Sequence, residues 1–235
     1  MKTLLAALLP LFAAGCGTAA APKAAPVHGD AAHPVVVELY QSQGCSSCPP
    51  AIANVNALAD RADVLPLMFA VTYWDQLGWK DTFAAPAYTA RQWDYAKAQG
   101  RAQVATPQVV VDGRAALVGS DKAGLDRAIA ANARGAGGPS IARAGNGVTI
   151  GAAAGGAATV WAVQYDPRPL SVPIRAGEND GRTLVHRGIV RSLTAIGTWT
   201  GAQATFALPA GNPSYKTAIL VQRGKGGPIV AAARI

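Results

Sequence analysis

The stretch from residue 35 to residue 50 constrains the fold of this chain more than any other. An apolar run is followed by a short polar loop, then by Cys45, two serines and Cys48, and then by two prolines. The apolar run predicts a buried strand. Proline is tolerated in the first turn of a helix, where the N–H groups have no partner, so the two prolines predict that a helix begins directly after Cys48. We therefore expect a strand, a loop and a helix, with a cysteine pair at the helix N-terminus.

This placement favours redox chemistry. The thiolate is the nucleophile in disulfide exchange, and the N–H groups and dipole at a helix N-terminus stabilise negative charge. We therefore expect Cys45 to attack a substrate disulfide and Cys48 to resolve the mixed disulfide that results. Two alternatives stay open, since a Cys-x-x-Cys pair also forms permanent structural disulfides and supplies two thiolates to zinc or copper.

The first 34 residues indicate export. Residues 1–16 hold one basic residue, a short apolar run and small residues before Cys16, which indicates a signal peptide rather than a membrane span. Residues 13–16 resemble the bacterial lipobox, which implies that Cys16 is lipidated; cleavage at a nearby small-residue site is the alternative. With Gly17 next, the anchor would lie in the outer membrane and face the periplasm. Residues 17–34 are rich in Ala and Pro and predict a flexible tether.

The next hundred residues alternate between strand and helix patterns. We expect strands at 35–40, 64–71, 108–111 and 115–118, and helices from Pro49, from Pro86 to about Gln99, and from a Ser120 cap to Asn132. The order is β-α-β-α-β-β-α. Right-handed crossovers then bring residues 45–48, 73–75 and 106–107 to one edge of a sheet.

This order and these motifs resemble the thioredoxin superfamily over residues 35–133. The matching residues are the strand at 37–40, the Cys45–Cys48 motif and the Thr106-Pro107 step. The resemblance implies that Pro107 is cis, packs against the disulfide and pairs with substrate. It also puts Glu38 in the place of the buried acid that exchanges a proton with the second cysteine; the alternative is that Glu38 faces solvent.

A narrower resemblance covers nearly all of the chain after the tether. The motifs at 38–50, 73–81, 106–108 and 177–181 look like those of the secreted thioredoxin-like proteins grouped as domain of unknown function 1223. That resemblance implies a family and no activity. Ser46 and Ser47 replace the usual Gly-Pro pair between the cysteines, which leaves the direction of electron flow open.

An aromatic loop follows the second expected strand. Tyr73, Trp74 and Trp79 offer a large apolar surface with few rotatable bonds, so together with Thr106 they are candidates for substrate contact. The alternative is that they only seal the sheet edge. For Asp75 and Asp81, a turn-forming role is favoured over acid–base chemistry.

From residue 140 to residue 235 the pattern predicts an all-β, sandwich-like domain. Short β-prone runs are separated by Gly, Asn and Pro, and residues 182–196 predict one long strand that contains a packed His186. Residues 134–235 hold eleven Lys and Arg and three acids, so this part carries the net charge of +8. Its basic surface is either a docking surface for an anionic partner or a solvated face.

Together these observations predict an exported thiol-disulfide oxidoreductase that acts on cysteine-containing envelope proteins, with a membrane redox partner. We expect no cofactor, no metal centre and no nucleic acid, because the sequence has no nucleotide, flavin, zinc or nucleic-acid motif. The alternatives are a non-catalytic binding module with a structural disulfide and a copper- or zinc-handling protein.

Overall fold

The computed structural model of the chain describes residues 28–235. The expected signal segment, the lipidation site Cys16 and residues 17–27 of the expected tether lie outside the described residues. Within the described residues, no helix has the length and apolar character needed to cross a membrane.

The first half has the element order that the sequence predicts. Its elements are β1 (Val35–Gln41), α1 (Pro49–Asn56), β2 (Val64–Ala70), α2 (Pro86–Ala98), β3 (Gln108–Val111), β4 (Ala115–Leu117) and α3 (Lys122–Asn132). One expected cap is wrong by a residue. Asp121, not Ser120, caps α3, because the Asp121 side chain accepts the N–H of Ala123 at 3.0 Å.

The second half contains only strands. They are β5 (Ile141–Ala144), β6 (Gly147–Ile150), β7 (Ala158–Asp166), β8 (Leu170–Pro173), β9 (Thr183–His186), β10 (Ile189–Trp199), β11 (Ala204–Ala207), β12 (Lys216–Gln222) and β13 (Ile229–Arg234). The single strand expected at 182–196 is two strands, broken at Gly188. This glycine has φ +73°, and a Cβ there would come within 2.8 Å of the Pro66 carbonyl oxygen, so the turn requires glycine.

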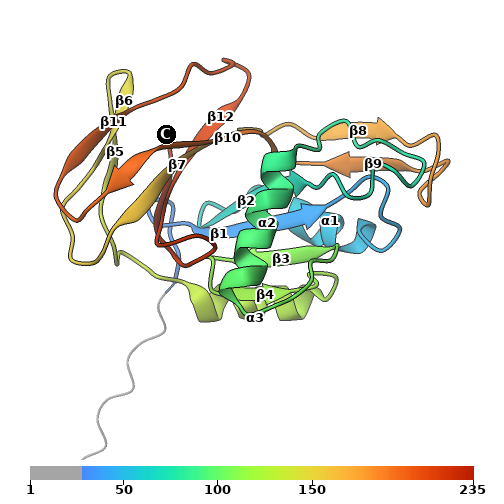
Figure 1. The fold of residues 1–235 in the computed structure, drawn as a ribbon, viewed down its shortest axis with the longest axis horizontal. Coiled ribbons are helices and arrows are strands. Elements are labelled where there is room, and N and C mark those ends of the chain that lie inside the picture. The colour runs from blue at the N-terminus through green and yellow to red at the C-terminus, as the bar shows by residue number, and fades with distance from the viewer. Residues whose placement is uncertain (1–27) are drawn as a thin grey trace, which may run out of the picture.

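Strands from both halves form one mixed sheet of eight strands (Figure 1). Its order is β13-β12-β7-β10-β2-β1-β3-β4. β1 pairs parallel to β2 and antiparallel to β3, and β10 joins β2 where Ile189 lies opposite Met68. This pairing covers an edge that the apolar β2 strand would otherwise expose. The sheet therefore contains strands from both sides of the domain boundary expected near residues 134–140. That the two parts are separate domains stays a prediction.

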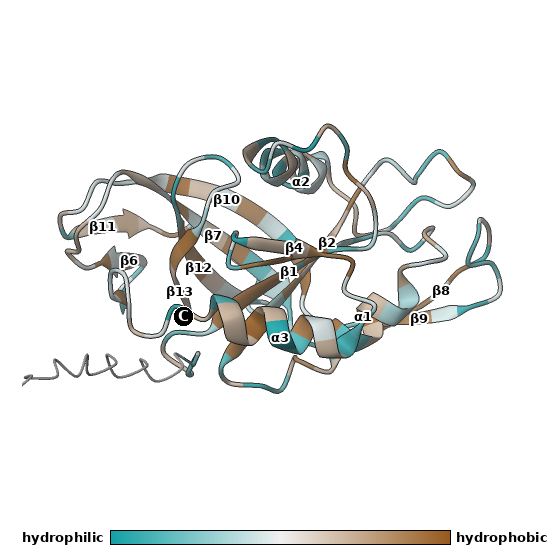
Figure 2. Ribbon diagram, turned by 90° about the horizontal axis from the view of Figure 1, so that it is seen from below, coloured by the Kyte–Doolittle hydropathy of each residue, from teal (hydrophilic) through white to brown (hydrophobic). Residues whose placement is uncertain are grey.

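Helices cover both faces of this sheet (Figure 2). α2 lies on one face, and α1 and α3 lie on the other. Side chains alternate along β1, so that Val35, Val37 and Leu39 pack with α1 and α3, while Val36 and Tyr40 pack beneath α2. All seven residues of β1 are buried, as expected for a central strand covered on both faces.

The far part of the large sheet has its own core. A three-stranded antiparallel sheet, β11-β6-β5, packs against it around the fully buried Trp199. A separate two-stranded sheet, β8-β9, lies beside α1 (Figure 1). The architecture is thus mixed α/β, with one large mixed sheet and additional antiparallel sheets. The sandwich expected for residues 140–235 does not stand apart. The three-stranded sheet β11-β6-β5 forms a second layer over strands that continue the sheet of the first half.

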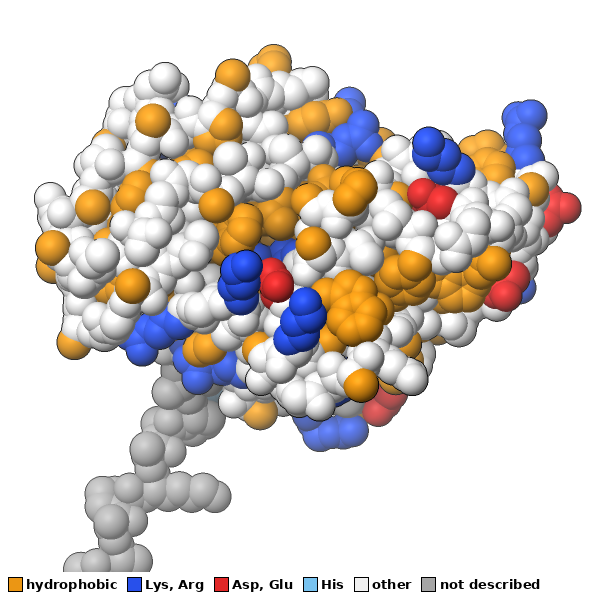
Figure 3. Space-filling model, in the orientation of Figure 1, with side chains coloured by type: hydrophobic (Ala, Val, Ile, Leu, Met, Phe, Trp, Pro, Cys, Tyr) orange, Lys and Arg blue, Asp and Glu red, His pale blue; other side chains and the backbone are white. Residues whose placement is uncertain are grey.

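The face shown in Figure 3 is mostly uncharged, with Lys and Arg gathered at its lower left and few acidic side chains. The large exposed hydrophobic side chains of the described residues are Leu77, Val118 and Val185. They are scattered single residues and do not indicate a docking surface.

His186, the last residue of β9, is a buried polar group without a partner. It is 0% exposed, neither ring nitrogen has a hydrogen-bond partner within the described residues, and the Phe83 ring lies edge-on at 5.9 Å between centroids. Burial lowers the pKa of His186 to about 4.

Replacement of His186 by leucine should change how stability depends on pH. The unfolded chain binds a proton at this residue below pH of about 6.5, and the folded chain does so only near pH 4. The wild-type chain should therefore lose up to about 3 kcal/mol of unfolding free energy between these pH values because of this group. Urea unfolding of wild type and His186→Leu from pH 7.5 to pH 4 measures this loss of unfolding free energy, which should be absent in the variant. Parallel curves for the two proteins would contradict the assignment.

Candidate functional site

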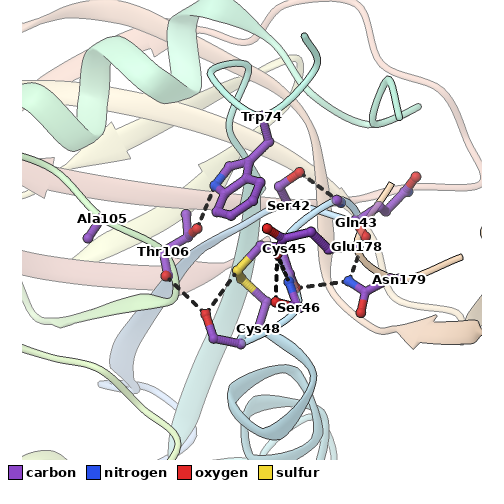
Figure 4. Close-up of a disulfide and its surroundings, with 12 residues drawn as sticks. Ser42, Gln43, Cys45, Ser46, Cys48, Trp74, Ala105, Thr106, Glu178 and Asn179 are labelled. Atoms are coloured by element: carbon purple, nitrogen blue, oxygen red, sulfur yellow. Dashed lines mark hydrogen bonds between the residues drawn. A yellow bond between two sulfur atoms is a disulfide. The ribbon is translucent and has the colours of Figure 1, made fainter. Parts of the chain in front are cut away.

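The candidate site is a Cys45–Cys48 disulfide between β1 and α1 (Figure 4). The two Cα atoms lie 5.4 Å apart. Cys48 is the N-cap of α1, and Pro49 and Pro50 occupy the first helical positions. The sequence-based placement of the pair at the start of a helix is confirmed.

The attack by Cys45 that the sequence predicts requires an accessible sulfur, and in this oxidised form neither cysteine is accessible. Both cysteines are 0% exposed and belong to the core cluster formed with α1, α3 and β1. Trp74 packs against the same cluster, and Ser46 and Ser47 form the exposed surface of the motif. A substrate cannot reach either sulfur unless part of this covering moves.

The expected donors to a Cys45 thiolate are also mostly occupied. The Ser46 N–H points to the Glu178 carboxylate at 3.2 Å, the Cys48 N–H donates to the Cys45 carbonyl at 3.2 Å, and the two prolines have no N–H. The hydroxyl of Ser47 lies 3.3 Å from the Cys45 sulfur. The Ser47 hydroxyl can therefore take the donor role toward Cys45 that the sequence assigned to the N–H groups of the helix N-terminus.

A segment 130 residues downstream closes over the motif. The Ser46 hydroxyl donates to Glu178 at 2.6 Å, and the buried Asn179 donates to the carbonyls of Gln43 and Cys45, each at 2.9 Å. The bonds from Ser46 lower the pKa of Glu178 below its ordinary value. We call residues 177–181 the capping loop. The Gly-Glu-Asn-Asp-Gly motif marked this loop in the sequence, but nothing there indicated that it contacts the cysteines.

Three other predicted site residues lie beside the disulfide. The Thr106–Pro107 peptide bond is cis, as the resemblance implies. The Trp74 indole N–H donates to the Thr106 hydroxyl at 2.7 Å, and the Ser47 hydroxyl reaches the Thr106 carbonyl at 3.4 Å. Trp74 and Thr106 thus form one wall of the site (Figure 4).

The other aromatic candidates make structural contacts. Trp79 donates to the Gln43 side chain at 2.9 Å, and Tyr73 donates from its hydroxyl to Gln92 on α2 at 3.2 Å. Asp81 accepts the N–H of Gln43 at 2.7 Å, and burial raises its pKa to about 6. These contacts hold the loop that precedes Cys45, so the structure places Trp79 and Asp81 as supports of that loop.

The structure does not bring Glu38 to the disulfide. Successive side chains of a strand point to opposite faces, and Glu38 points to the α2 face, away from the cysteines. There its carboxylate pairs with Arg91 at 2.7 Å and accepts a hydrogen bond from Tyr95. Burial works against the charge of Arg91, but the Glu38 carboxylate holds the pKa of Arg91 above its ordinary value. The proposed proton exchange between Glu38 and Cys48 is therefore wrong on geometric grounds.

No metal cluster accompanies the cysteine pair in residues 28–235. In this part of the chain, no three His, Cys, Asp or Glu side chains lie close enough together to hold one ion. The metal-handling alternative thus has no third protein ligand in this part of the chain.

Comparison with known proteins identifies the family. The family model described as a protein of unknown function, DUF1223, matches residues 36–222. The chain belongs to this family. A crystal structure of another protein, from Agrobacterium tumefaciens, is 33% identical, with a TM-score of 0.72 over 86% of this chain and 93% of that chain. HBP35 of Porphyromonas gingivalis is 15% identical, with a TM-score of 0.57 over 88% of this chain and 76% of that chain, which shows likeness of fold alone. No curated protein matches.

A Glu38→Gln substitution in this DUF1223 protein should destabilise the fold and leave the cysteines unaffected. Removing one partner of a buried ion pair strands the other charge, so the unfolding free energy should fall by about 3–5 kcal/mol. Asp60→Asn is the control, because Asp60 pairs with Arg187 at the surface, where water and salt screen the pair, so its loss should change the unfolding free energy far less. Alkylation rates of the reduced protein across pH should match wild type for both variants. A shifted alkylation profile in Glu38→Gln alone would restore Glu38 to the redox site.

Proposed function

We propose that this protein is a thiol-disulfide oxidoreductase with a thioredoxin-like arrangement around Cys45 and Cys48. The observation that carries the proposal is the position of the disulfide between the end of β1 and the start of α1, next to the cis Thr106–Pro107 bond. Trp74 and the exposed serines 46 and 47 complete a surface that a peptide can approach once the capping loop moves.

The proposed reaction exchanges one disulfide for another. In the dithiol form, the Cys45 thiolate attacks one sulfur of a substrate disulfide, and the other substrate sulfur leaves as a thiolate. The Cys48 thiolate then attacks Cys45, which re-forms the Cys45–Cys48 bond and releases the second substrate sulfur. Two electrons pass to the substrate, and the reverse sequence oxidises a substrate dithiol. The Ser47 hydroxyl can donate to the Cys45 thiolate from its position 3.3 Å away.

The capping loop gives this reaction a gate. The carboxylate of Glu178 accepts a hydrogen bond from the Ser46 N–H, and its negative charge disfavours a thiolate at the adjacent Cys45. Loss of the bonds to Glu178 and Asn179 would uncover the motif and remove that charge together. The proposed cycle therefore begins with release of the capping loop.

The proposed substrates are cysteine-containing proteins of the bacterial envelope, and a membrane reductase or oxidase exchanges electrons with the Cys45–Cys48 pair. This setting follows from the expected export signal and from the lipid anchor expected at Cys16.

The burial of both cysteines favours a second candidate function. In it the disulfide is a permanent clamp, and the chain is a non-catalytic binding module of the envelope. A disulfide that is 0% exposed at both cysteines and bonded to a second segment fits such a clamp.

Thiol trapping separates the two functions. The protein is equilibrated at graded ratios of reduced to oxidised glutathione, and its thiols are then alkylated and counted. An oxidoreductase should titrate between dithiol and disulfide and should catalyse insulin reduction, and Cys48→Ser should accumulate mixed disulfides with envelope proteins. A pair that stays oxidised at every ratio, with no insulin reduction, identifies the clamp.

A Glu178→Gln substitution should speed reduction of the disulfide by dithiothreitol. A hydrogen bond to a charged acceptor is replaced by a weaker neutral one, so we expect an increase of about tenfold in rate. Asp180→Asn is the matched control, because it removes the same charge from the capping loop at an exposed residue and should leave the rate near wild type. Equal rates in all three proteins would show that the Glu178 contact does not limit access.

A further inference from the structure

An open pocket of about 420 Å³ lies away from the disulfide, where four segments of the chain meet. They are the turn between β3 and β4, the end of α3 with the loop that follows, the loop between β6 and β7, and the end of β12 with the start of β13. Three of these segments contribute one arginine each to the lining, namely Arg114, Arg134 and Arg223, and no acidic side chain is among the described residues that line it. We call it the arginine pocket.

Close backbone contacts hold the walls of the pocket together. The Ile229 N–H donates to the Asp112 carbonyl at 2.9 Å, which joins the two turns. A Cβ on Gly113 would come within 2.3 Å of the Gly227 carbonyl oxygen, and one on Gly138 within 2.1 Å of the Val230 carbonyl oxygen. Both glycines have positive φ, so the chain needs glycine there for two reasons. The arginines therefore extend from a rigid frame.

Within the described part of the chain, the protein balances only one of the three positive charges of the pocket. Arg134 pairs with the buried Asp112, but Arg114 and Arg223 form no salt bridge within residues 28–235. The Arg223 side chain donates to the Ala154 carbonyl at 3.3 Å, and its Nε–H is buried with no partner in the described residues. Buried donors are nearly always bonded in native proteins, and a bound ion is one way to satisfy such a group.

We propose that the arginine pocket binds a phosphate group. Guanidinium groups present paired N–H donors that match phosphate oxygens, and two arginines without a salt-bridge partner suit a tetrahedral anion. The pocket is larger than one phosphate, so it has room for a molecule that carries the group. Arg134 also donates to the carbonyl of Pro34, the last residue of the expected tether, which places the pocket beside the end of that segment. Both a soluble phosphate compound and a phospholipid headgroup carry this chemistry. The site is independent of the proposed redox function.

Titration with inorganic phosphate tests the site in the full soluble chain. At constant ionic strength set with chloride, phosphate should raise the melting temperature of the wild type and give a saturable calorimetric signal. Arg114→Gln and Arg223→Gln should each weaken binding about tenfold or more. Arg114 is exposed, so its replacement should not disturb folding. Arg143→Gln is the matched control, because it removes the same charge at an exposed arginine outside the pocket.

If the response to phosphate is no greater than the response to chloride, or is equal in all four proteins, the pocket does not bind free phosphate. The remaining form of the proposal is then binding of a phospholipid headgroup. Sedimentation with phosphatidylglycerol vesicles, against phosphatidylcholine vesicles, provides that second arm. Binding to the anionic vesicles that is lost in Arg114→Gln and Arg223→Gln and kept in Arg143→Gln assigns a lipid headgroup. Saturable binding of phosphate without vesicle binding assigns a soluble ligand. Failure of both arms rejects the site, whatever the outcome of the thiol experiments.

Discussion

The pairing of β10 with β2 is the interaction on which the rest of the structure depends. It joins the two halves of the chain into one sheet, at the point where Ile189 lies opposite Met68 and the Met68 N–H donates to the Gly188 carbonyl at 2.8 Å. Because the second half is fixed there, the capping loop just before β9 reaches the cysteine motif 130 residues earlier. The same sheet continuity brings the turn between β12 and β13 against the turn between β3 and β4. Both candidate sites thus contain residues from both halves.

The electrostatics around the disulfide depend on the contact between the capping loop and the cysteine motif. A helix N-terminus ordinarily has free N–H groups that can donate to a thiolate, but here the Ser46 N–H already donates to the Glu178 carboxylate. The capping loop therefore covers the oxidised pair and places the Glu178 carboxylate beside it. Ser47 is the one side chain of the motif with a hydroxyl close to the sulfur. In the proposed oxidoreductase, the reactivity of Cys45 would depend on the capping loop as much as on the helix.

The two faces of the sheet have different tasks because a strand alternates its side chains. The face with α1 and α3 holds the disulfide in an apolar cluster, whereas the face with α2 buries the Glu38–Arg91 pair with Tyr95 and Gln222. Gln222 lies on β12, so this polar network also connects the first half to the second. A buried pair of this kind is costly to disrupt by removing one partner, which makes Glu38 a structural residue.

The sequence by itself determined the local elements and the motif. The β-α-β-α-β-β-α order and the helix start after Cys48 follow from apolar runs and from proline and glycine signals, which act over a few residues. The cis bond before Pro107 was implied by the family resemblance of its motif. Tertiary structure alone decided which strands share a sheet, which face Glu38 takes and what covers Cys45. Those outcomes depend on pairing between segments far apart in the chain. Strand β10 and residue Asn179 carry no local signal of their partners, because the hydrogen bonds they make are available to many sequences and are selected only when the whole core packs.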